Sequence, residues 1–226
     1  MKDDVKVWDW SIRVFHWSLP VLLFLLWFSA TQSQSFDALD HHMILAQILL
    51  GLLIYRIIWG FIGTPAARFS RFLTGPASWW IYASALIKRQ PIHYLGHNPL
   101  GGLMVLVLLG ALGFQLLTGL YTSDDILFQG PLVSSADRDT VRWMSRWHKN
   151  FFDWILILVT LHLTAIALYK LMGEGLVKAM FTGKKPMIES APDKAKLLPA
   201  PESFPWIKFA IAVMIAAGIV YYLFHV

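Results

Sequence analysis

Long apolar runs separated by polar segments dominate the chain. A helix of about 20 apolar residues is long enough to cross the hydrocarbon core of a bilayer. The pattern therefore predicts five membrane-spanning helices, at residues 14–31, 43–63, 99–121, 149–171 and 206–225. A further apolar segment with two adjacent tryptophans, 76–87, is too short to span a membrane and is predicted to lie at its interface.

The polar segments between these runs alternate in their content of lysine and arginine, and this alternation predicts the orientation of the chain. The N-terminal segment, the loop 64–98 and the stretch 170–204 are rich in basic residues. The loop 31–42 has none, and the loop 122–148 offsets three arginines with four aspartates. We therefore expect the basic segments and the N-terminus in the cytoplasm, and the C-terminus on the periplasmic side.

The same pattern predicts an all-α integral membrane protein with three parts. Residues 1–186 form a four-helix transmembrane domain, and 187–205 form a cytoplasmic linker that contains proline and lysine. Residues 206–226 form an additional C-terminal transmembrane helix. The N-terminal segment is too polar and too acidic for a signal peptide, so the first span is expected to stay in the mature protein.

Composition supports a membrane protein and narrows its chemistry. The 226 residues are 57% hydrophobic and 15% charged, with a mean hydropathy of +0.55. The absence of cysteine excludes disulfides, cysteine-ligated iron–sulfur clusters and covalently attached c-type haem. The net charge of +5 comes from basic residues between the spans, where topology explains them, so no nucleic-acid partner is expected.

Several of the eight histidines lie within or beside the apolar runs. His148 and His162 are fourteen residues apart, so on a helix they share one face and lie about 21 Å apart along the axis. By depth in the predicted topology, His42 pairs with His148 on the outer side, and His16 pairs with His162 on the inner side. Two imidazoles at each of two depths are the axial ligands that two bis-histidine haems require.

An arginine strengthens this interpretation. Arg56 follows His42 by fourteen residues and is predicted to lie on the same helix face, at the depth of the inner pair. A guanidinium inside a membrane needs a partner, and a haem propionate is a suitable bidentate anion. His41 is the alternative ligand, and we prefer His42 because only it shares the face of Arg56. His97 is predicted to cap the third spanning helix, bind a propionate or line a quinone pocket.

These residues also allow other interpretations. A single membrane histidine can also hydrogen-bond across helices or relay protons. Zinc or iron transport needs histidines and carboxylates clustered at one depth, and the spans contain almost no carboxylate apart from Asp153. Glycines on the third helix allow a porphyrin or another helix to approach its backbone: Gly101, Gly102, Gly110 and Gly113.

Five separated motifs, together spanning roughly residues 6–186, resemble the prokaryotic cytochrome b561 family, and within it the branch of b-type subunits of nickel-iron hydrogenases. The motifs are "WDWSIRVFHW" at 8–17, "RIIWGFIGTPAARFSRF" at 56–72, "GHNPLGG" at 96–102, the spacing of His148 and His162, and "LVKAMFTGKKP" at 176–186.

The resemblance implies a four-helix bundle in a bacterial inner membrane with two non-covalent b haems that exchange electrons with the quinone pool. Its axial ligands, carried over by motif, are His16, His42, His148 and His162. The family usually has glycine where this chain has Ala46, so haem packing there is expected to differ slightly. The fifth helix lies outside the common core of the family.

The leading hypothesis is an electron-transfer subunit of a quinone-linked oxidoreductase system, with no catalytic side chain of its own. It would link ubiquinone or menaquinone, bound near His97 and Arg68, to a periplasmic c-type cytochrome or hydrogenase-like redox subunit on the loop 122–148. A second hypothesis is a self-contained quinone oxidoreductase that reacts with a small molecule such as superoxide at the outer haem. A haem or metal carrier is the third.

Overall fold

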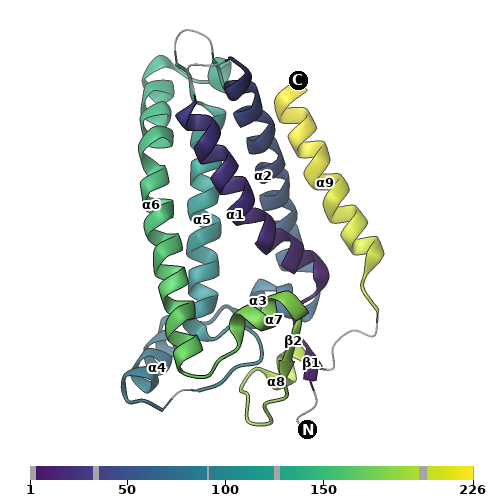
Figure 1. The fold of residues 1–226 in the computed structure, drawn as a ribbon. Coiled ribbons are helices and arrows are strands. Elements are labelled where there is room, and N and C mark those ends of the chain that lie inside the picture. Colours follow the sequence, from purple (N-terminus) through teal and green to yellow (C-terminus); the bar gives the residue numbers. More distant parts are fainter. Residues whose placement is uncertain (1–3, 33–35, 91, 125–127, 199–202, 226) are drawn as a thin grey trace. The chain divides into compact units, whose positions relative to one another are not determined.

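The computed structural model describes residues 4–32, 36–90, 92–124, 128–198 and 203–225. Figure 1 shows the arrangement of its elements along the chain. In chain order they are β1 (Asp4–Lys6), α1 (Trp10–Thr31), α2 (Phe36–Ile62), a 3-10 turn (Pro65–Ala67), α3 (Phe69–Phe72), α4 (Pro76–Ile87), α5 (Pro99–Leu120), a 3-10 turn (Val133–Ser135), α6 (Arg138–Leu171), α7 (Leu176–Thr182), β2 (Lys184–Pro186), α8 (Lys194–Leu197) and α9 (Trp206–His225).

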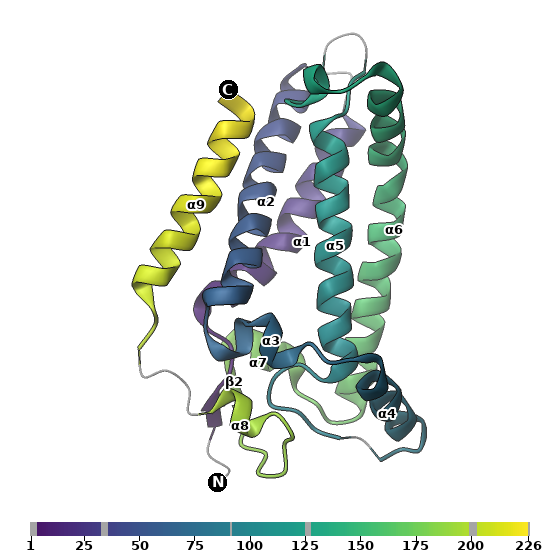
Figure 2. The ribbon, with the colours of Figure 1, turned by 180° about the vertical axis from the view of Figure 1, so that it is seen from behind.

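Five helices in the described part of the chain are long and apolar enough to cross a membrane: α1, α2, α5, α6 and α9. The predicted all-α class and its five spans are therefore confirmed. Helix α4 covers the same residues, 76–87, as the predicted interfacial segment. Between the spans, α3 and α4 follow the end of α2 as two short helices (Figure 2).

Three helices begin before the predicted spans. Helix α6 begins at Arg138 instead of residue 149, α2 at Phe36 instead of residue 43, and α1 at Trp10 instead of residue 14. The start of α6 is fixed by Asp137, whose carboxylate accepts hydrogen bonds from the backbone N–H groups of residues 139 and 140, at 2.9 Å each. Helix α6 therefore includes polar residues that precede the apolar run from which the span was predicted.

The chain divides into two compact units. Unit 1 comprises Met1–Phe15, Arg56–Val107 and His162–Ile211. Unit 2 comprises His16–Tyr55, Leu108–Leu161 and Ala212–Val226. The five long helices each contribute residues to both units.

Unit 2 has an aliphatic core to which α1, α2, α5 and α6 all contribute. Its buried members are Leu22, Leu26, Leu49, Leu50, Leu53, Ala111, Leu112, Leu116 and Ile155. Helix α9 adds partly buried side chains to the same core, Val220 among them. Burying these apolar side chains favours close packing of the helices and fixes the polar residues that they carry.

In unit 1, backbone hydrogen bonds connect the N-terminal residues 4–8 to residues 183–186. Strands β1 and β2 pair antiparallel, with Val5 opposite Lys185 (Figure 1). The N–H groups of Val7 and Trp8 both donate to the carbonyl of Gly183, at 2.8 and 3.1 Å. Gly183 has a φ of +76°, and a Cβ there would lie 2.7 Å from the carbonyl oxygen of Trp8, so glycine is required.

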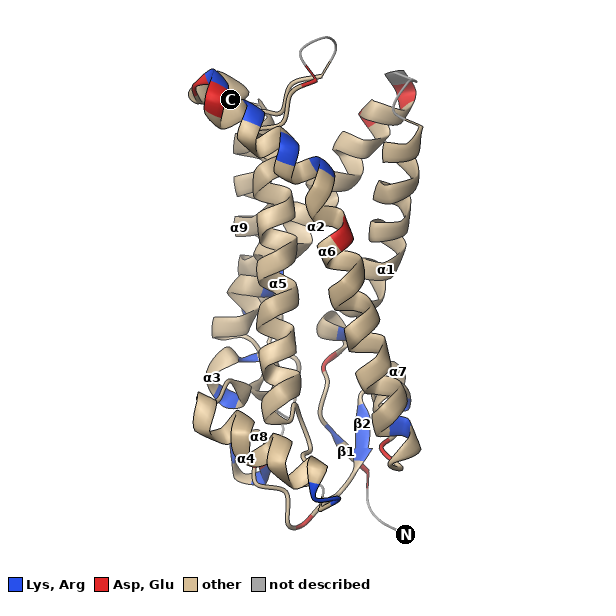
Figure 3. Cartoon of the chain, turned by 90° about the vertical axis from the view of Figure 1, so that its left-hand side faces the viewer, with Lys and Arg blue, Asp and Glu red and all other residues tan. Residues whose placement is uncertain are grey.

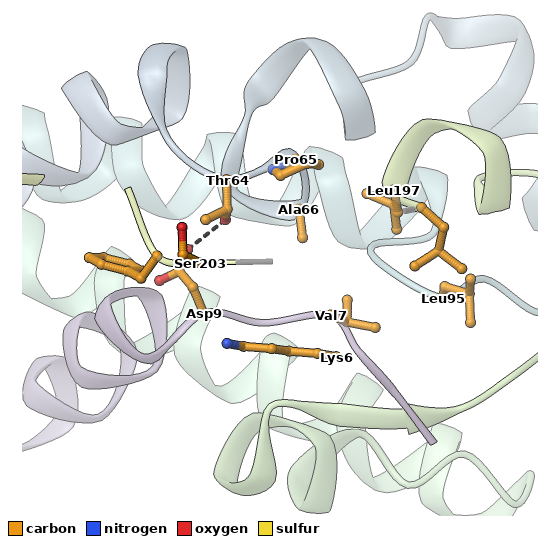
Figure 4. Close-up of a pocket in the computed structure, with 11 residues that line it drawn as sticks. Lys6, Val7, Asp9, Thr64, Pro65, Ala66, Leu95, Leu197 and Ser203 are labelled. Carbon is orange, nitrogen blue, oxygen red and sulfur yellow. Dashed lines mark hydrogen bonds between the residues drawn. The ribbon is translucent and has the colours of Figure 1, made fainter. Parts of the chain in front are cut away.

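Asp9 organises the start of α1 in unit 1. Its carboxylate is buried and accepts hydrogen bonds from Thr64 Oγ1 at 2.6 Å and Trp59 Nε1 at 3.1 Å. It also accepts from Ser11 Oγ and the N–H of Ile12, at 2.6 and 2.9 Å. The bonds from Thr64 and Trp59 connect the "WDW" and "WGFIGT" motifs. Figure 4 shows the bond to Thr64 at the edge of a small cavity.

The predicted division into 1–186, 187–205 and 206–226 stays a prediction, and residues 199–202 and 226 lie outside the described part. The described start of the linker is folded. It contains α8, with Leu197 and Asp193 buried.

Candidate functional site

His42 on α2 and His148 on α6 face each other within unit 2. Their ring centroids are 6.2 Å apart and the ring planes are nearly perpendicular, at 89°. Both side chains are half-buried, whereas the neighbouring His41 is exposed. The structure therefore brings together the two histidines of the predicted outer pair.

Hydrogen bonds orient both imidazoles. His42 Nδ1 lies 3.1 Å from the carbonyl oxygen of Leu26, and His148 Nδ1 lies 3.0 Å from that of Gln115. A carbonyl oxygen only accepts, so each Nδ1 carries the proton and each Nε2 keeps the lone pair that can bind a metal. Ligating histidines commonly donate their other nitrogen to a carbonyl in this way.

The separation of the rings fits one metal ion between them. An imidazole nitrogen binds a transition metal at about 2 Å, so two rings on opposite sides of one ion have centroids about 6 Å apart. A cavity adjoins the pair and has mainly apolar walls, as haem requires. It is lined by His42, Met43, Ala46, Leu50, Leu116, Gly119, Leu120, Thr122, Phe128, Pro131, His148 and Phe224.

Gly119 on α5 lets His148 approach the helix backbone. A Cβ at this position would lie 2.9 Å from Cε1 and 3.1 Å from Nδ1 of His148, closer than ordinary van der Waals contact. Any larger residue would therefore displace the imidazole. Ala46, which stands where the family usually has glycine, lines the same cavity.

The two histidines of the predicted inner pair belong to different units, His16 to unit 2 and His162 to unit 1. Each side chain is half-buried. The ring of His16 packs edge-on against Trp17, with centroids 5.1 Å apart. Their pairing stays a prediction from sequence.

The two predicted arginines both lie in unit 1. Arg56 is 4% exposed, donates to the carbonyl of Ala67 at 3.3 Å and lies over the ring of Phe69, 5.1 Å from its centroid. Arg68 Nε donates to the carbonyl of Gly63 at 2.7 Å. These contacts hold the turn between α2 and α3, and a propionate-binding role for Arg56 stays a prediction.

His97 lies between two aromatic rings of unit 1. Its centroid is 4.6 Å from that of Trp8 and 4.5 Å from that of Phe72. The cap of α5 is supplied by its neighbour, because Asn98 Oδ1 accepts from the N–H of Gly101 at 2.8 Å. The predicted contact of His97 with a propionate or a quinone stays a prediction.

Sequence reasoning missed the groups that orient the outer pair. Ser29 Oγ lies 3.0 Å from His42 Nδ1, and Gln115 Nε2 donates to the carbonyl of His148 at 2.9 Å. Thr118 Oγ1 lies 3.5 Å from His148 Nδ1. The only trace of these residues in the sequence is that each is a polar residue within an apolar run.

The helices and these contacts define a class of protein: a multi-pass membrane protein with a paired-histidine centre in a helical bundle. The model of the family described as prokaryotic cytochrome b561 matches residues 7–183, and the chain belongs to this family. It is thus a membrane protein that binds haem b and transfers electrons. No curated protein and no solved structure matches the chain.

Proposed function

We propose that this protein is a di-haem b-type cytochrome that transfers electrons between the quinone pool and a periplasmic redox partner. The observation that carries the proposal is the pair of His42 and His148, with centroids 6.2 Å apart and both Nδ1 atoms turned toward carbonyl oxygens. Haem b, when bound, supplies an iron centre that gains and loses one electron at a time.

The residues of this chain set the conditions for that chemistry. His42 and His148 would hold the outer iron from two helices, and hydrogen bonding at Nδ1 raises the basicity of the ligating nitrogens. The apolar side chains of the cavity exclude water from the group. His16 and His162 are proposed as the axial ligands of the inner haem, on the strength of their spacing and motifs.

Quinone and partner are assigned to opposite sides. We place ubiquinone or menaquinone near His97 and Arg68 on the cytoplasmic side of a bacterial inner membrane. The partner, a c-type cytochrome or hydrogenase-like subunit, would bind the periplasmic loop 122–148. The distribution of lysine and arginine supports this orientation; for example, β2 and its surroundings in unit 1 are rich in basic residues (Figure 3).

The haem content of the purified protein tests the central claim. We expect two non-covalent b haems per chain by pyridine haemochrome, low-spin in both oxidation states. His42→Ala and His148→Ala should each remove one haem, and His16→Ala and His162→Ala should each remove the other. The matched control is His41→Ala, which should keep both. One haem in the unaltered protein would refute the di-haem assignment.

A kinetic measurement separates the proposal from a self-contained oxidoreductase. Mixed with a quinol analogue alone, the protein should accept electrons until its haems are reduced and then stop. Sustained turnover with quinol and superoxide, with no protein partner, would instead support the small-molecule reaction at the outer haem.

A further inference from the structure

The loop that carries His97 is held by charged side chains from a distant part of unit 1. Residues 93 to 96 are consecutive, and each contacts a charged residue from the segment 174–193. The family match ends at residue 183, so part of this segment lies beyond the shared core.

Asp193 makes the firmest of these contacts. Its carboxylate accepts from the N–H of Leu95 at 3.0 Å and from the N–H of Gly96 at 2.7 Å. Asp193 is 7% exposed and Leu95 is fully buried. A Cβ at Gly96 would lie 3.3 Å from the carboxylate and 3.0 Å from Leu197, so the glycine permits this close approach.

Two further charged residues hold the first half of the loop. Lys185 is 5% exposed and donates from Nζ to the carbonyl of Tyr94 at 2.7 Å. It also pairs with Glu174 at 3.5 Å, and Glu174 contacts His93 Nδ1 at 2.6 Å. Burying a charged side chain is costly unless it is hydrogen-bonded. The burial of these charged residues therefore depends on their bonds to the loop.

A purely local role does not explain Asp193. It stands at the N-cap of α8, yet its side chain makes no capping hydrogen bond to that short, fully described helix. Its two acceptor oxygens are directed to the loop instead. The next residue of the loop after Gly96 is His97, and it is followed by Asn98, which caps α5.

We propose that Asp193 is a positioning residue, assisted by Lys185 and Glu174, that fixes His97 where it contacts the quinone headgroup. The proposal rests on the proposed function, because it assigns His97 to the quinone site. It makes the segment after residue 183 part of that site's support.

The test uses the full-length protein in detergent and follows haem reduction by a soluble ubiquinol and a menaquinol analogue. Asp193→Asn leaves one loop N–H facing an amide donor, and we expect the half-saturating quinol concentration to rise about tenfold, the equivalent of one charge-assisted hydrogen bond. The limiting rate should stay unchanged. Glu189→Gln is the control, because Glu189 lies on the same segment but is exposed and bonds Lys194.

A double-variant comparison distinguishes positioning from general stability. If Asp193 acts through His97, then Asp193→Asn should change nothing further in a His97→Ala protein. An equal rise in half-saturating concentration in both backgrounds, or no rise in either, would overturn the proposal.

Hydrogen exchange keeps the two proposals separable. Asp193→Asn should speed amide exchange at residues 95–97, and Glu189→Gln should not. If neither quinol reduces the unaltered protein, the quinone assignment fails, and with it the contact of His97 with quinone. Unchanged exchange would overturn the positioning of the loop by Asp193.

Discussion

Replacing Gly119 with alanine should weaken the outer haem site selectively. The added Cβ would lie 2.9 Å from His148 Cε1, whereas ordinary contact begins at 3.4 Å, so the ring must retreat by the difference, about 0.5 Å. Because His148 Nδ1 lies 3.0 Å from the carbonyl of Gln115, the retreat also weakens the bond that orients the ring.

The size of the effect follows from these two contributions. Overpacking costs about 1–3 kcal/mol, and a weakened neutral hydrogen bond costs about 1 kcal/mol. A total of about 3 kcal/mol corresponds to haem binding about 100-fold weaker at this site. The inner site should keep its haem.

The assay is the haem content after purification and the rate of haem loss to a scavenging protein. Gly110→Ala is the matched control, since it lies on the same helix and a Cβ there meets nothing within 4 Å. Gly119→Ala should lose about one haem, and Gly110→Ala should keep two. Equal haem retention in both variants would refute the inference that His148 ligates haem in the position described.

Three further substitutions test other parts of the structure. Asp9→Asn should lower the free energy of unfolding by about 2 kcal/mol, because it leaves buried donors such as Thr64 Oγ1 poorly paired, and thermal unfolding in detergent measures this. Burial, and then the charge of Asp193, raise the pKa of Tyr94, so its contribution to stability is present below about pH 10, the unfolded value, and is lost as pH rises through the folded pKa. Tyr94→Phe should therefore lose less stability than the unaltered protein in alkaline titration. Ala46→Gly should keep both haems and cost about 1 kcal/mol of helix stability, measured by haem content and chemical unfolding.

Each of these has a clear contrary result. An Asp9→Asn protein as stable as its parent would show that the four bonds do not stabilise unit 1. Identical alkaline stability profiles with and without the Tyr94 phenol would contradict its raised pKa. Loss of the outer haem in Ala46→Gly would show that the alanine methyl group contributes packing that the haem requires.

The five spans and the outer histidine pair could be predicted because each leaves a local, periodic signal. An apolar run of about 20 residues has few alternatives to a membrane helix, and depth along helices brings His42 and His148 to one level. The start of α6 had no such signal. Between Arg138 and Lys149 polar residues interrupt the apolar ones, and the start of the helix depends on a hydrogen-bonded cap at Asp137.

The residues that orient His42 and His148 could not be predicted, for a different reason. A serine, glutamine or glycine in an apolar run is equally compatible with helix packing, a backbone bond or a ligand contact, as Ser29, Gln115 and Gly119 illustrate. Only the position of the neighbouring helix decides between these roles. Candidate ligands can thus be proposed from residue type and spacing, whereas the residues that orient them can be identified only from the fold.

Asp193 shows the same limit at longer range. It is separated from the residues it holds by 97 and 98 positions, in a segment whose proline and lysine content predicts a linker. Composition describes the average solvent exposure of such a segment, but a single buried carboxylate can still bind a loop N–H pair and determine how that loop is held. Two hydrogen bonds from one side chain are therefore enough to connect a segment beyond the family's shared core to the loop that carries His97.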